Sequence, residues 1–125
     1  MGIKRNAADE LTARILYCVI RVHQILGPGF LESIYRRALL IELKRQNLYV
    51  ECEKQITIYY EGQEVGIHRL DLVVENKVIL ELKTVESLSR AHYAQVRSYL
   101  KATGIKTALL INLSGEKADI RRLNA

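Results

Sequence analysis

Two alternating segments and a short loop decide the fold: Arg69-Leu70-Asp71-Leu72-Val73-Val74, then Glu75-Asn76-Lys77, then Val78-Ile79-Leu80-Glu81-Leu82-Lys83. Alternation of apolar and polar residues is typical of half-buried β-strands, so the sequence predicts a hairpin. We expect one core face on each strand, made by Leu70, Leu72 and Val74 and by Val78, Leu80 and Leu82.

The opposite faces of this hairpin carry its charged residues. A three-residue loop pairs Val74 with Val78 and so places Asp71 opposite Glu81, with Cβ atoms about 4.5–5.5 Å apart. Two carboxylates at this separation repel, and a divalent cation is a natural compensation, because Mg²⁺ prefers oxygen and is held by one or two carboxylates plus waters. Lys83 projects to the same side, where it would activate water or offset charge on a phosphate.

A salt-bridge ladder is the alternative explanation of the same charges. Arg69 and Lys83 would then neutralise Asp71 and Glu81 on a solvated face. The spacing alone leaves both interpretations open.

The rest of the chain predicts the order α-α-β-β-β-α-β-β. We expect helices at about 9–26, 30–46 and 87–103, and strands at about 56–60, 64–74, 77–84, 106–113 and 118–123. This order indicates a mixed α+β class in which helices cover a central sheet. Residues 1–125 contain no repeat, linker or composition break, so we expect a single domain. One stripe of the second helix is expected to be buried: Leu31, Ile34, Tyr35, Ala38 and Ile41.

Composition and charge narrow the function classes. The chain is 49% hydrophobic and 26% charged, which excludes disordered and low-complexity scaffolds. It has no apolar run of 18 residues and no signal-peptide pattern, so we expect no membrane partner and a cytoplasmic location. Residues 51–90 hold eight acidic and five basic residues between two basic segments, within a net charge of +5. That distribution suits a phosphate-rich polymer whose chemistry needs a cation, although small proteins are often mildly basic.

Two helical pairs add candidate site residues. Glu32 and Tyr35 share a face in Gly29-x-x-Glu32-x-x-Tyr35, and Gln95 and Tyr99 share a face at i, i+4. Each pair alone has a structural explanation: an acid favoured by the helix dipole, and a half-buried stripe. His23 and His68 have no evident partner, and His92 lies about one turn before Gln95. All three are interpreted as non-catalytic.

Together these motifs resemble those of a known superfamily. Asp71, nine residues and then Glu81-Leu82-Lys83 resemble the signature of the PD-(D/E)XK nucleases, with Leu70 where the proline of the name stands. The segment Gly29-Phe30-Leu31-Glu32-Ser33-Ile34-Tyr35 resembles the motif of the small GxxExxY proteins in that superfamily. The segment Gln95-Val96-Arg97-Ser98-Tyr99 is similar to its QxxxY motif.

The resemblance implies a restriction-endonuclease-like α-β-β-β-α-β core with a central mixed sheet, and hydrolysis of DNA phosphodiester bonds that depends on Mg²⁺ or Mn²⁺. Carried over by position, Asp71 and Glu81 would be metal ligands, and Glu32 would reach the metal directly or through water. Lys83 would be the catalytic lysine. Two further residues would line the site: Gln95 and Tyr99.

The sequence also leads to expectations about binding partners. We predict that Arg69, Arg97 and Lys101 contact nucleic acid, and we leave a homodimer open. The alternative function is a catalytically silent nuclease-fold module that binds nucleic acid or a protein. A degenerate frame of that kind is expected to lose a carboxylate or the lysine, whereas this sequence keeps Asp71, Glu81 and Lys83.

Overall fold

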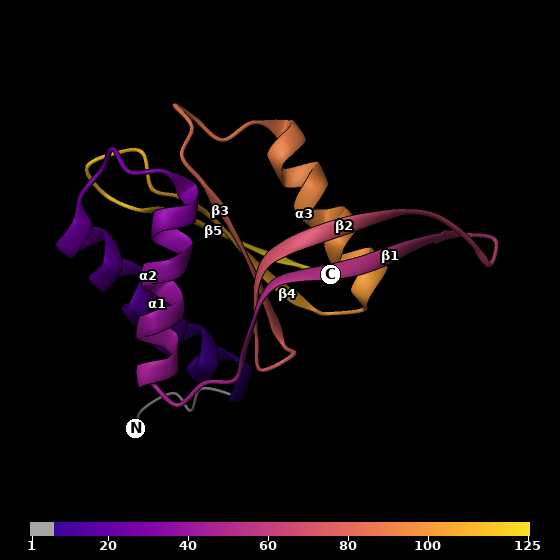
Figure 1. The fold of residues 1–125 in the computed structure, drawn as a ribbon, viewed down its shortest axis with the longest axis horizontal. Coiled ribbons are helices and arrows are strands. Elements are labelled where there is room, and N and C mark those ends of the chain that lie inside the picture. Colours follow the sequence, from indigo (N-terminus) through magenta and orange to yellow (C-terminus); the bar gives the residue numbers. More distant parts are fainter. Residues whose placement is uncertain (1–6) are drawn as a thin grey trace, which may run out of the picture.

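The structure is a computed structural model that describes residues 7–125 (Figure 1). Its order of helices and strands is the predicted α-α-β-β-β-α-β-β. The helices are α1 (Ala7–Leu26), α2 (Glu32–Arg45) and α3 (Arg90–Thr103). The strands are β1 (Val50–Tyr60), β2 (Gln63–Val74), β3 (Val78–Lys83), β4 (Thr107–Asn112) and β5 (Asp119–Asn124).

A five-stranded mixed sheet lies between two helical layers. Its strands lie in the order β1-β2-β3-β4-β5, and every neighbouring pair is antiparallel except β3 and β4, which α3 connects in parallel. Helices α1 and α2 cover one face and α3 covers the other (Figure 1). Leu80 and Leu82 of β3 pack toward α1 and α2, whereas Ile79 packs toward α3. The predicted mixed α+β class is therefore confirmed.

The loop between β2 and β3 has the predicted three residues, since Val74 pairs with Val78. Glu75 and Asn76 in this loop both have a φ of 54°, a left-handed conformation that closes the tight turn. The ladder ends at the pair Leu72 and Leu80, one pair before Asp71 would meet Glu81. The two strands therefore separate where their acidic residues begin.

The prediction that Leu70 shares a core face with Leu72 was wrong. Leu70 packs in the cluster under α3, whereas Leu72 packs under α1 and α2. Between them the β1–β2 ladder has no recorded pair at Asp71, and Glu53 on β1 has a left-handed φ of 53°. The hairpin bends at this point, so simple alternation does not continue through it.

The buried stripe predicted for α2 was also wrong in part. Tyr35 is buried, but Leu31 and Ile41 are 70% and 54% exposed. The inner face is instead formed by Tyr35, Leu39 and Leu43, spaced four residues apart. Apolar residues occupy more than half of the circumference of α2, and the hydrophobic period alone does not decide which part faces the sheet.

The first strand begins earlier than predicted and makes a long arm with β2. Strand β1 starts at Val50 rather than near Ile56, and the β1–β2 hairpin projects past α3 (Figure 1). Within the described part of the chain, no helix has the length and apolar character needed to cross a bilayer.

Candidate active site

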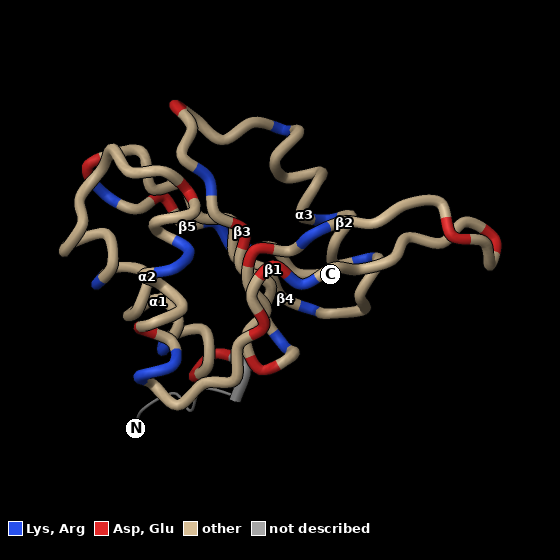
Figure 2. The backbone as a smooth tube through the Cα atoms, viewed as in Figure 1, with Lys and Arg blue, Asp and Glu red and all other residues tan. Residues whose placement is uncertain are grey.

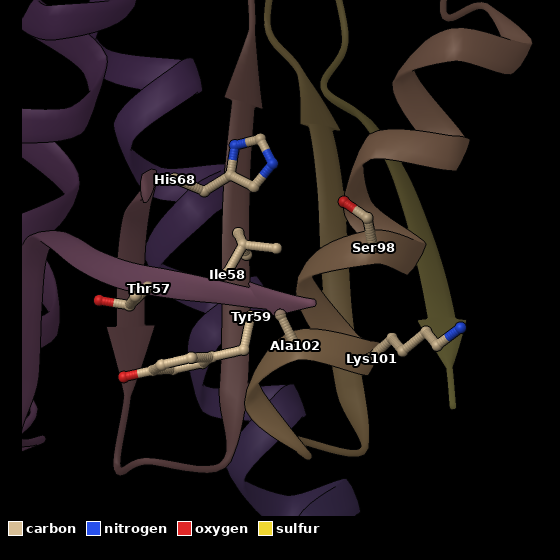
Figure 3. A pocket seen from close by; sticks show the side chains of 7 residues that line it. All are labelled: Thr57, Ile58, Tyr59, His68, Ser98, Lys101 and Ala102. Carbon is tan, nitrogen blue, oxygen red and sulfur yellow. The ribbon is translucent and has the colours of Figure 1, made fainter. Parts of the chain in front are cut away.

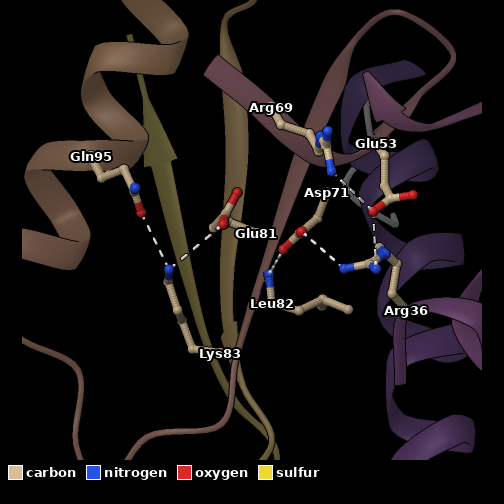
Figure 4. A network of polar contacts seen from close by, with 8 residues as sticks. All are labelled: Arg36, Glu53, Arg69, Asp71, Glu81, Leu82, Lys83 and Gln95. Carbon is tan, nitrogen blue, oxygen red and sulfur yellow. Dashed lines mark hydrogen bonds and ion pairs between the residues drawn. The ribbon is translucent and has the colours of Figure 1, made fainter. Parts of the chain in front are cut away.

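Asp71 and Glu81 lie together at the point where β2 and β3 diverge (Figure 4). The backbone N–H of Leu82 donates a hydrogen bond of 2.8 Å to Asp71 Oδ2, in a position where a regular ladder would provide a backbone acceptor. This bond holds the Asp71 carboxylate between the separated strands. The two acids thus share one side of the hairpin, as the spacing predicts, although they are not a directly paired ladder position.

Glu81 is a buried acid in a strongly perturbed environment. Its side chain is 8% exposed, and its Oε2 is buried without a hydrogen-bond partner. Burial and, after it, the neighbouring charge of Asp71 together raise the pKa of Glu81 from 4.5 to about 8, against the opposing charge of Lys83. Carboxylate pairs with such a pKa are common at functional sites, because repulsion and burial disfavour two negative charges.

Lys83 links this acidic pair to α3. Its Nζ lies 3.7 Å from Glu81 Oε1 and donates a hydrogen bond of 3.2 Å to Gln95 Oε1 (Figure 4). The parallel pairing of β3 with β4 places the Lys83 backbone beside Asn112, and the Lys83 carbonyl accepts a bond of 2.9 Å from Leu113 N–H. Both its backbone and its amine are therefore held in place.

Tyr99 is buried on α3, near enough to the acidic pair to feel its charge. It is 3% exposed, and its burial together with the charges of Glu81 and Asp71 raises its pKa to about 12. The Gln95 side chain partly offsets this rise in the pKa of Tyr99. The predicted Gln95 and Tyr99 pair thus faces the same site as Lys83.

Glu32 approaches the site from the first turn of α2. Burial raises its pKa, Lys83 and Arg36 oppose the rise, and the charge of Asp71 adds to it. Glu32 is therefore close enough to interact electrostatically with both the acid and the lysine. Among residues 7–125, no three His, Cys, Asp or Glu side chains form a group that could hold a metal ion. Whether Glu32 would reach a metal directly or through water stays a prediction.

Arg36 and Glu53 are site residues that the sequence reasoning missed. Arg36 Nη1 lies 3.5 Å from Asp71 Oδ1, and its Nη2 lies 3.2 Å from Glu53 Oε1. Arg69 Nη1 lies 3.7 Å from the same Glu53 oxygen rather than beside Asp71 (Figure 4). The salt-bridge ladder is thus present in part, with Arg36 in the place expected for Arg69. The sequence could have indicated Arg36, because it follows Glu32 at i+4 on α2 and so lies on the same face of the helix.

Of the three basic residues predicted to contact nucleic acid, Arg69 belongs to this network through Glu53, whereas Arg97 and Lys101 lie on α3. Arg97 and Lys101 are exposed on α3, and the Arg97 guanidinium lies 5.9 Å from the centre of the Tyr93 ring. Arg69 is 60% exposed on β2. All three are accessible to a ligand in solution.

We expect Arg36→Gln to destabilise the protein by about 1–3 kcal/mol, the range for removing a partly buried charged hydrogen-bond partner. The substitution removes the positive charge of the Arg36 guanidinium, which Asp71 contacts on its α2 side, and leaves Asp71 beside the second acid, Glu81. Urea unfolding at pH 7 measures the change, with Arg37→Gln as the control because Arg37 is exposed on the next position of the helix. Equal stability of the two variants would contradict a positioning role for Arg36.

A mixed sheet with this carboxylate pair and lysine fits the nuclease class that the sequence resembles. A family model of the PD-(D/E)XK nuclease superfamily matches residues 9–123. The chain belongs to this superfamily.

Solved structures agree with this fold. The chain is similar to the crystal structure of SSO0001, with a TM-score of 0.60 and 20% sequence identity over 98% of this chain and 70% of that chain. At that identity the likeness concerns the fold alone. No curated protein matches the chain.

Proposed function

We propose that the protein is a nuclease that hydrolyses DNA phosphodiester bonds with Mg²⁺ or Mn²⁺. The observation that carries the proposal is the buried, unpartnered Oε2 of Glu81 beside Asp71. A buried polar atom without a partner costs free energy, and a ligated cation would supply that partner. The resemblance of residues 29–35 to the GxxExxY motif supports a closer relation to that group of proteins.

The residues present fit a hard divalent cation. Mg²⁺ is commonly bound by one or two carboxylates and keeps several waters, which a two-carboxylate site allows. Asp71 and Glu81 would hold it, and Glu32 would act through a water. When bound, the metal supplies a Lewis acid for the phosphate and an activated water.

Other side chains of the protein would stabilise charge, position Lys83 and contact the DNA. Lys83 places a positive charge beside Glu81, where it offsets the negative charge that develops on the phosphate. Gln95 holds the Lys83 amine, and Tyr99 closes the wall of the site against water. Exposed basic residues would contact the phosphates that flank the cut: Arg69, Arg97 and Lys101.

A cleavage assay tests the proposal. Purified protein is incubated with end-labelled single-stranded DNA, duplex DNA and RNA in Mg²⁺, Mn²⁺ or EDTA, beside Glu81→Ala. We expect cleavage of DNA in either metal, none in EDTA and none by the variant. Binding of DNA without cleavage in any metal would favour the catalytically silent module. A homodimer and a cytoplasmic location stay predictions from the sequence.

A further inference from the structure

A cavity of about 420 Å³ lies between the β1–β2 arm and α3 (Figure 3). On the arm, Ile58 and His68 point toward α3, whereas Thr57 and Tyr59 point to the other side of β1 (Figure 3). The wall on α3 is built from short side chains, Ser98 and Ala102. The cavity is therefore an open space with an apolar floor and an imidazole at one end.

His68 connects this cavity to the candidate active site. Its ring contacts that of Tyr99 edge to face, with centroids 5.2 Å apart and an angle of 68°. Tyr99 is in turn close enough to Glu81 and Asp71 for their charges to raise its pKa, after the larger effect of burial. Along α3, Gln95 at the site precedes Ser98 and Ala102 by rises of about 4.5 and 10 Å. The cavity therefore begins about one helical turn along α3 from Gln95, the residue that accepts a hydrogen bond from Lys83.

The charges around the cavity favour a polynucleotide that follows α3. This helix carries Arg90, Arg97 and Lys101 and no acidic residue. The tip of the arm is acidic, with Glu61 and Glu64 (Figure 2). Phosphates are attracted to the helix and repelled by the tip, so the strand would pass the cavity without continuing along the arm.

We propose that the cavity holds one unpaired nucleotide of the substrate strand, next to the phosphodiester that is cut. Its base would lie against the ring of His68, and its phosphate would face Lys101, whose side chain extends outside the cavity (Figure 3). Aromatic surfaces bind single-stranded bases in this way without sequence preference. This inference rests on the proposed nuclease function and names its substrate class: DNA with unpaired nucleotides at the cut.

Filling the cavity tests the inference through binding, independently of cleavage. The probes are a fluorescein-labelled 12-nucleotide oligo-dT strand and a blunt 12-base-pair duplex, with affinity measured by anisotropy in EDTA. We expect the single strand to bind about tenfold tighter than the duplex. Ala102→Phe should remove this preference, whereas Ala94→Phe, at another exposed alanine of α3, should keep it.

Substitution of His68 provides a second readout. His68→Ala should weaken single-strand binding about as much as Ala102→Phe, and His68→Phe should restore it, because the aromatic surface is kept. Duplex affinity should stay unchanged in all four variants.

The outcomes separate this inference from the proposed function. Equal single-strand affinity of the wild type and Ala102→Phe would overturn the cavity assignment, even if both cleave DNA. Equal affinity of the wild type for strand and duplex would overturn it as well. Single-strand binding that depends on Ala102, without cleavage in any metal, would overturn the nuclease function and support the cavity assignment.

Discussion

Glu81→Gln is expected to abolish cleavage and, at the same time, to stabilise the metal-free protein at alkaline pH. The two effects share one cause. A buried carboxylate beside Asp71 is unfavourable until a cation accompanies it, and glutamine keeps the shape of the side chain without its charge. Since metal-ion stabilisation of a transition state is worth several kcal/mol, activity should fall by roughly 10³-fold or more.

The pH dependence of this effect has a definite sign. The pKa of Glu81 rises from 4.5 to about 8 on folding, so between these values the folded state binds more protons than the unfolded state. The free energy of unfolding therefore decreases as the pH rises through this window. Glu81→Gln removes that decrease, and its melting temperature in EDTA should exceed that of the wild type by several degrees at pH 8 and by much less at pH 5.

Thermal unfolding in EDTA at both pH values measures the stability change, and the DNA assay measures activity. Glu116→Gln is the control, because Glu116 is an exposed acid in the turn between β4 and β5. Calorimetry in two buffers adds an independent check: binding of Mg²⁺ by the wild type near pH 7 should release a proton from Glu81. A variant that is inactive but less stable at pH 8 would indicate misfolding and contradict this account of Glu81.

The sequence was sufficient to predict the hairpin that carries the site. Strong alternation on both strands and a short polar loop fixed the register, and the register placed Asp71 and Glu81 on one side. It could not predict where the ladder ends, because the separation depends on a bond from Leu82 N–H to the Asp71 side chain. The alternation of apolar and polar residues does not show where a side-chain carboxylate takes the place of a backbone carbonyl as the acceptor.

Tertiary packing explains the other two differences between the sequence-based expectations and the structure: the buried face of α2 and the contact of Arg36 with Asp71. The orientation of α2 depends on which of its two apolar stripes fits the sheet, and Tyr35, Leu39 and Leu43 occupy that position. The contact between Arg36 and Asp71 joins residues 35 positions apart, so only the folded chain reveals it. The motif around Glu32 lies in the first turn of α2, the end from which Glu32 interacts electrostatically with Lys83 and Asp71.

Lys83→Met is expected to lower kcat and kcat/KM together, by about 10²–10³-fold, while leaving DNA binding in Ca²⁺ nearly unchanged. The Lys83 amine is held between Glu81 and Gln95 and its side chain is only 16% exposed, so it has little freedom to act as a general phosphate contact. Under the proposed function, its charge would instead lie where negative charge develops on the phosphate during hydrolysis. Methionine keeps much of the length of the side chain and removes the charge.

Arg97→Ala is the matched comparison for Lys83→Met. Arg97 is exposed on α3 and is proposed to contact a phosphate, so its loss should weaken DNA binding and leave kcat unchanged. The slope of log affinity against log salt should decrease by about 0.7 for a single strand and 0.9 for a duplex. Stopped-flow cleavage under single-turnover conditions, with anisotropy in Ca²⁺, separates the two behaviours. If Lys83→Met lost affinity and salt dependence as Arg97→Ala does, with kcat intact, Lys83 would be a phosphate-docking residue, and the chemical step would rely on Asp71, Glu81 and the groups around them.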